Sequence, residues 1–164
     1  MGLVAEQILA ALELPEMVVN DYLRDLSDEE LLLRPLPNMN HIAWQLGHLI
    51  SSEHFHIEQV APGAMPPLPE GFAESHDGHA ALRDDPRAFC SKSEYLAAMD
   101  QQRAGTRAAL AALSDEQLAA PSPESIRYFG PTVAAVFAGE SAHWMMHAGQ
   151  WAVIRRQLGR PPLY

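Results

Sequence analysis

Apolar residues recur every three or four positions along most of the chain, which is the spacing of amphipathic helices. No stretch shows the sustained alternation of apolar and polar residues that is typical of a β-strand. The pattern predicts an all-α protein, an antiparallel four-helix bundle with a long connection between its second and third helices. The expected helices cover residues 4–26, residues 38 or 40 to 60, residues 91–113 and residues 131–158.

Residues that begin or end helices support these boundaries. Ser91 and Glu94 have the spacing of a capping box at the start of the third helix. Pro131 is expected in the first turn of the fourth helix, and Gly159 is expected to end it. Pro15 interrupts the first helical pattern, so we expect that helix to be bent or split.

Residues 61–90 are dense in proline and glycine and form the least regular part of the sequence. A connection of this length in a small domain is either functional, as a lid or rim, or a mobile surface loop. Phe72, His76 and His79 lie on it and are candidates to border a site, the alternative being a solvated rim.

Composition and charge narrow the function classes. The 164 residues fit a single domain, residues 1–164. A formal net charge of −10 removes the main electrostatic contribution to nucleic-acid binding, so no nucleic-acid partner is expected. No apolar run approaches the length of a membrane span, and the N-terminus lacks a basic segment. With Cys90 as the only cysteine, we expect a cytoplasmic protein without a membrane partner.

Histidines supply the candidate chemistry. His143 and His147 lie four residues apart, so they share one face of the fourth helix, where neutral imidazoles can chelate a divalent metal. His48 on the second helix is the first candidate for a third ligand, and His41 is the second. The alternative is that these are core histidines that bond to carbonyl or carboxylate groups.

Glu140 lies on the same stripe, one turn before His143. It is a candidate base or hydrogen-bond partner of a ligand, or else a carboxylate on the rim of the site. The zincin pattern His-Glu-x-x-His is absent because Trp144 and Met145 follow His143, which argues against a metalloprotease.

Two segments of the sequence resemble the DinB/YfiT-like superfamily. The run from His143 to Gln150 is similar to the His-x-x-x-His-x-Gly-Gln of that family's last helix. The segment from Asn40 to Leu49 resembles its ligand-bearing second helix, and the order of the helices also agrees. The sequence departs from the family at Ala148, where an arginine is common.

The resemblance implies a metal site formed by His48, His143 and His147, occupied by a divalent transition metal: zinc first, with nickel or iron as alternatives. It also implies a homodimer and a small-molecule substrate. Characterised relatives include thiol-dependent isomerases and S-transferases. The chain is therefore expected to be a metal-dependent enzyme of thiol S-transferase type, with a low-molecular-weight thiol as cosubstrate.

Two alternatives remain at this stage. Three imidazoles leave coordination positions open, so a bound water could be activated for hydrolysis instead of a thiol. The chain could also be a non-catalytic bundle that binds metal or dimerises. Cys90 has no evident base beside it in the sequence and is not expected to act as a nucleophile.

Overall fold

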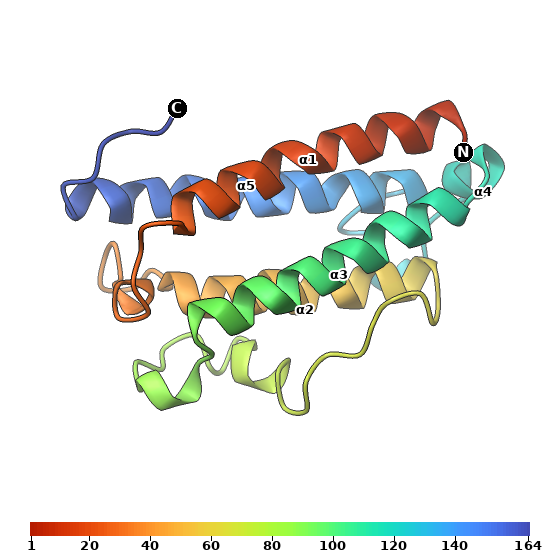
Figure 1. Ribbon diagram of the computed structural model, residues 1–164. Coiled ribbons are helices and arrows are strands. Elements are labelled where there is room, and N and C mark those ends of the chain that lie inside the picture. Colours follow the sequence, from red (N-terminus) through yellow and green to blue (C-terminus); the bar gives the residue numbers. More distant parts are fainter.

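The computed structural model describes residues 1–164, and four long helices form its body (Figure 1). They are α1 (Leu3–Leu23), α2 (Ile42–Val60), α3 (Lys92–Ala112) and α5 (Val133–Gln157). A short helix, α4 (Asp115–Ala119), follows α3. Single 3-10 turns lie at Glu30–Leu32, Glu74–His76, Pro86–Ala88 and Glu124–Ile126. The all-α four-helix bundle predicted from the sequence is confirmed.

The helices contact one another around a square. Helix α1 packs on α5 and α3, and α2 packs on α3 and α5. Helices α1 and α5 run in one direction, whereas α2 and α3 run in the other, because the long α2–α3 connection returns the chain along the bundle (Figure 1). Helices α2 and α5 are therefore antiparallel neighbours, and the seam between them carries the candidate site.

The helix boundaries follow the local chemistry. The predicted capping box at Ser91 and Glu94 is present and starts α3 at Lys92. Helix α2 begins later than expected, because the His41 side chain accepts the backbone N–H of Trp44 and acts as the N-cap. Thr132 caps α5, so that helix begins after Pro131 instead of at it.

Pro15 does not split the first helix, so of the two predicted outcomes, a bend or a split, the split is wrong. Helix α1 continues through Pro15, whose ring is buried. A proline in a helix leaves the carbonyl four residues earlier without its N–H partner. Here that carbonyl belongs to Ala11, and the Ser141 hydroxyl of α5 donates to it at 2.7 Å. The neighbouring helix thus replaces the hydrogen bond that the proline removes.

The α2–α3 connection is packed against α2. Its backbone carbonyls accept hydrogen bonds from α2 side chains: Asp77 from the Trp44 indole and Arg83 from the His41 ring, both at 3.0 Å. His76 is 2% exposed, so the solvated rim considered for this residue is wrong. Its ring occupies a notch that exists because Gly47 has no side chain, and a Cβ there would come within 2.0 Å of the ring.

Candidate metal site

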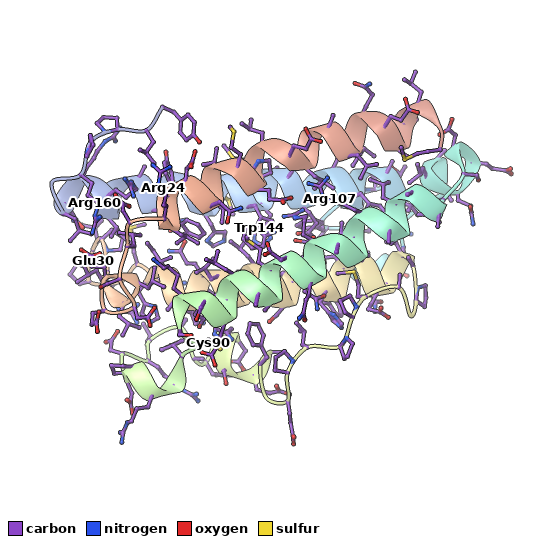
Figure 2. All side chains as sticks on the ribbon, in the orientation of Figure 1. Arg24, Glu30, Cys90, Arg107, Trp144 and Arg160 are labelled. Atoms are coloured by element: carbon purple, nitrogen blue, oxygen red, sulfur yellow. The ribbon has the colours of Figure 1, made fainter.

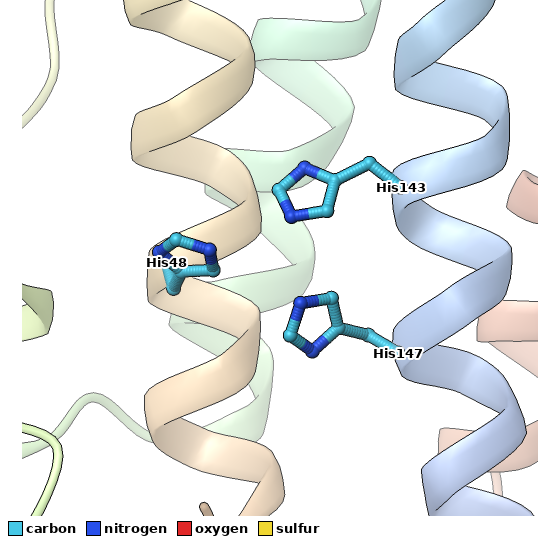
Figure 3. A group of neighbouring side chains, drawn as sticks. All are labelled: His48, His143 and His147. Carbon is cyan, nitrogen blue, oxygen red and sulfur yellow. The ribbon is translucent and has the colours of Figure 1, made fainter. Parts of the chain in front are cut away.

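Three histidines converge at the seam between α2 and α5. His48 projects from α2, and His143 and His147 project from α5 one turn apart (Figure 3). One nitrogen of each ring lies within 4.8 Å of the corresponding nitrogen of the other two. The structure thus brings together the residues that the sequence predicts as metal ligands, although their coordination of a metal remains a prediction.

The orientation of His48 depends on its neighbour Trp44, one turn earlier on α2. The two rings stack with their centroids 4.8 Å apart and their planes at 6°. The Trp44 indole is itself fixed by its bond to the Asp77 carbonyl. The α2–α3 connection therefore contacts the site through Trp44.

The orientation of His147 is set by Gln45. The Oε1 atom of Gln45 accepts the indole N–H of Trp151 at 2.8 Å, and its amide nitrogen donates to the Asn40 carbonyl at 2.6 Å. An indole N–H can only donate, so the atom facing it must be the amide oxygen. The same oxygen lies 2.9 Å from Nδ1 of His147, which must carry a proton to bond it. The Nε2 atom of His147 is then unprotonated, as a metal ligand requires.

The three rings are neutral near pH 7. Burial lowers the pKa of His143 to about 3, with further lowering by His147 and His48. Burial also lowers the pKa of His147 to about 4 and lowers that of His48. A neutral imidazole keeps a free lone pair, so no proton has to leave these rings before a cation binds.

The residues present fit a divalent transition metal. His143 Nδ1 is buried and has no hydrogen-bond partner in the protein, so this ring is not committed to another structural role. His48 and His143 are partly exposed, whereas His147 is buried, so the cluster meets solvent on one side. Three nitrogen donors with access from solvent are typical of zinc and related metals at sites with open coordination positions.

The other histidines are engaged elsewhere. His41, the second candidate ligand, caps α2 and bonds the Arg83 carbonyl, so it lies outside the cluster. His54 bonds Gln102, and His76 bonds the Tyr95 hydroxyl.

Cys90 is half-buried, and burial raises the pKa of its thiol, which disfavours the reactive thiolate.

Glu140 is fully buried, so it is not a carboxylate on the rim. Its Oε1 atom lies 2.7 Å from Nδ1 of His56. The position of His56 near the far end of its helix predicts a solvated side chain, but the residue is buried. The Oε2 atom of Glu140 has no partner. The action of Glu140 as a base or as a partner of a ligand remains a prediction.

A buried ion pair behind the site was not predicted from the sequence. Glu53 of α2 is 1% exposed and lies 3.2 Å from the Arg103 guanidinium of α3. It also accepts hydrogen bonds from the Thr106 hydroxyl at 2.6 Å and the Trp144 indole at 2.8 Å. One feature of the sequence indicates that Glu53 is buried: it falls on the apolar stripe of α2, four residues after Leu49.

Replacing Gln45 by leucine should weaken metal binding. Leucine has a similar size but cannot accept the Nδ1 proton of His147, so the ring loses its fixed tautomer and orientation. Loss of such a partner typically lowers metal affinity by about 10–100-fold. Competition with a chromophoric chelator measures the zinc affinity of the Gln45→Leu variant. Gln59→Leu, which is on the same helix outside the cluster, is the control, and equal affinities in the two variants would contradict this role for Gln45.

None of the helices is both long and apolar enough to cross a membrane. The comparison with curated proteins gives no match. The family profile described as DinB superfamily matches residues 11–151, a range that includes all three histidines of the cluster. The chain belongs to the DinB superfamily, and it carries a three-histidine cluster that could bind a metal.

Proposed function

We propose that this protein is a metal-dependent enzyme that transfers a low-molecular-weight thiol to an electrophilic small molecule. The observation that carries the proposal is the convergence of three neutral imidazoles at a partly exposed position of the α2–α5 seam. His48, His143 and His147 would hold the metal, zinc first, with nickel or iron as alternatives. The family resemblance favours thiol transfer over hydrolysis, and it also predicts the homodimer.

The reaction joins the thiol sulfur to the electrophilic carbon and releases the leaving group together with the thiol proton. When bound, the metal would lower the pKa of a coordinated thiol and so provide a nucleophile near neutral pH. The residues of the chain orient the site. Gln45 fixes the ring of His147, and Trp44 stacks on His48. Cys90 takes no part, because burial keeps its thiol protonated.

Elemental analysis of untagged protein tests the metal site first. We expect about one equivalent of transition metal in the wild type and its loss in His143→Ala and His147→Ala. His79→Ala is the matched control, because His79 is exposed and lies outside the cluster. Absence of metal from the wild type even after reconstitution would refute both the enzyme and the metal-binding bundle.

Activity is tested with the metal-loaded protein. A thiol and the electrophile monochlorobimane should give turnover that depends on both metal and thiol. Turnover of ester or amide substrates without thiol would identify a hydrolase instead. Stoichiometric metal with no turnover in either assay would favour a non-catalytic metal-binding bundle.

A further inference from the structure

A chain of three hydrogen-bonded side chains runs from solvent into the core beside the three histidines. The Tyr128 hydroxyl lies 3.1 Å from Nε2 of His56, whose Nδ1 lies 2.7 Å from Oε1 of Glu140. Tyr128 is 76% exposed, His56 is 4% exposed and Glu140 is fully buried. An exposed tyrosine is thus held by a buried histidine, which is itself held by a buried carboxyl group, and the proposed metal site uses none of the three.

This chain lies on the same seam as the histidine cluster. His56 and His48 are two turns apart on α2, about 12 Å along the helix axis, and Glu140 is one turn before His143 on α5. The Phe129 ring connects the two groups, because it stacks on His56 at 3.9 Å and meets the edge of His143 at 5.8 Å. The histidine cluster and the Tyr128–His56 contact are therefore neighbours on the seam, with the Phe129 ring between them.

The buried charges require a proton within the His56–Glu140 pair. Arg103 is the only buried guanidinium near Glu140, and Glu53 already neutralises it. Two buried carboxylates with one cation would leave an uncompensated charge in the core. Burial, together with the nearby Glu53, raises the pKa of Glu140. The unpartnered Oε2 of Glu140 also fits a carboxyl group that is not carrying a free negative charge.

That proton fixes the direction of the hydrogen bonds. If it resides on Glu140, it lies on Oε1 and is donated to Nδ1 of His56, because a proton on the partnerless Oε2 would be a buried donor without an acceptor. The neutral ring then carries its own proton on Nε2. If it resides on His56, both ring nitrogens are donors. In either state Nε2–H donates to the Tyr128 oxygen. The Tyr128 O–H is then left to donate outwards.

We propose that Tyr128 donates a hydrogen bond to a carboxylate of the thiol that binds at the three-histidine site, and that His56 and Glu140 position it. The proposal rests on the proposed function. A carboxylate is the expected acceptor because a hydrogen bond to a charged group is stronger than one to a neutral oxygen. The thiol must have several bonds between its sulfur and its carboxylate in order to span the seam.

Binding of thiols to the cobalt-substituted protein tests this without turnover. The probes are mercaptocarboxylates of two to six carbons and mercaptoalcohols of the same lengths, with dissociation constants read from the sulfur-to-cobalt absorption. In Tyr128→Phe we expect the longer mercaptocarboxylates to bind about tenfold more weakly, since a charged hydrogen bond is lost. The mercaptoalcohols should change less than twofold, and the cobalt content should stay the same.

Three further variants separate positioning from folding. Glu140→Gln should keep the wild-type affinity for mercaptocarboxylates, because its amide can still donate to His56, whereas Glu140→Leu should lose affinity as Tyr128→Phe does. Tyr164→Phe is the matched control, because Tyr164 is 64% exposed and its hydroxyl bonds Asp21 instead. A Glu140→Gln variant that behaves like Glu140→Leu would overturn the assigned hydrogen-bond direction.

The remaining outcomes distinguish the two proposals. Equal mercaptocarboxylate affinity in Tyr128→Phe and the wild type would overturn the role of Tyr128 and leave the metal site intact. Cobalt uptake without thiol binding would also overturn it. Failure of the wild type to take up cobalt would refute the proposed function and, with it, the contact between Tyr128 and the thiol carboxylate.

Discussion

Lowering the pH of the metal-free protein from 7 to 4 is expected to unfold it. Burial lowers the pKa of His143 to about 3 and that of His56 and His147 to about 4, and it also lowers those of His41, His48 and His76. An unfolded chain binds protons at these residues below about pH 6.5. Between pH 6.5 and the lowered pKa values of the folded protein, the unfolded state binds more protons than the folded state.

The sign of the effect follows from this difference. The contribution of these histidines to the free energy of unfolding is complete above pH 6.5 and decreases as the pH falls. The decrease is up to about 1.4 kcal/mol per pH unit for each histidine that stays unprotonated in the folded state. Several such residues together can exhaust the 5–15 kcal/mol that is typical of a domain. Glu140 acts in the opposite direction, because its raised pKa favours the fold at low pH, but it is a single residue.

Urea denaturation at half-unit steps of pH measures this dependence. Zinc should raise the stability at pH 7, because it binds only the folded state, and should make the loss on acidification steeper. Replacing His56 by phenylalanine should lower by about one the number of protons taken up on unfolding between pH 6.5 and 4, and so reduce the slope of the unfolding free energy against pH. A free energy of unfolding that is constant over this range would contradict the lowered pKa values of the buried histidines.

The sequence predicts the helices because the signals for them are local. Capping pairs such as Ser91 and Glu94 act within four residues, and the apolar period marks the buried face. Pro15 shows where local reasoning stops. The hydrogen bond that stabilises the helix there comes from Ser141, 130 residues after the Ala11 carbonyl that accepts it, and no pattern around Pro15 indicates it.

The three histidines of the cluster could be predicted for a different reason than the residues around them. His143 and His147 lie on one helix at chelating spacing, and His48, the first candidate for the third position, is also the residue that the family pattern implies. The hydrogen-bond partner of His147 is Gln45, which is 102 residues earlier in the sequence. No spacing rule identifies a glutamine that orients a histidine in this way. Groups that fix ligands depend on which side chains meet across a seam, and this requires the packed structure.

The buried ion pair makes Glu53 the residue whose loss should destabilise the protein most. Glu53→Ala would leave the Arg103 guanidinium buried without its partner. It would also remove the acceptor of the Thr106 hydroxyl and the Trp144 indole. Breaking one side of a buried pair typically costs about 3–5 kcal/mol, because the remaining charge is uncompensated.

Chemical denaturation of Glu53→Ala and of the control Glu6→Ala measures this cost. Glu6 is exposed in the first turn of α1, and surface substitutions of this kind usually change stability by less than about 0.5 kcal/mol. Replacing Arg103 by methionine in the Glu53→Ala protein should restore part of the lost stability, because it removes the stranded charge. A cost below about 1 kcal/mol, both for Glu53→Ala and after Glu140→Gln is added to it, would show that the pair is not buried as described.

Glu140 should limit the damage in the Glu53→Ala variant. Without Glu53, one cause of the raised pKa of Glu140 disappears, so its carboxylate becomes the natural partner of Arg103. Both groups have unused hydrogen-bonding atoms, Oε2 on Glu140 and Nε and Nη1 on Arg103. Adding Glu140→Gln to Glu53→Ala removes this substitute, so the double variant should lose more stability than the sum of the two single variants. Simple additivity would instead mean that Arg103 and Glu140 do not interact. Glu53 and Glu140 would then not face one common cation, which is the reason given for a proton within the His56–Glu140 pair.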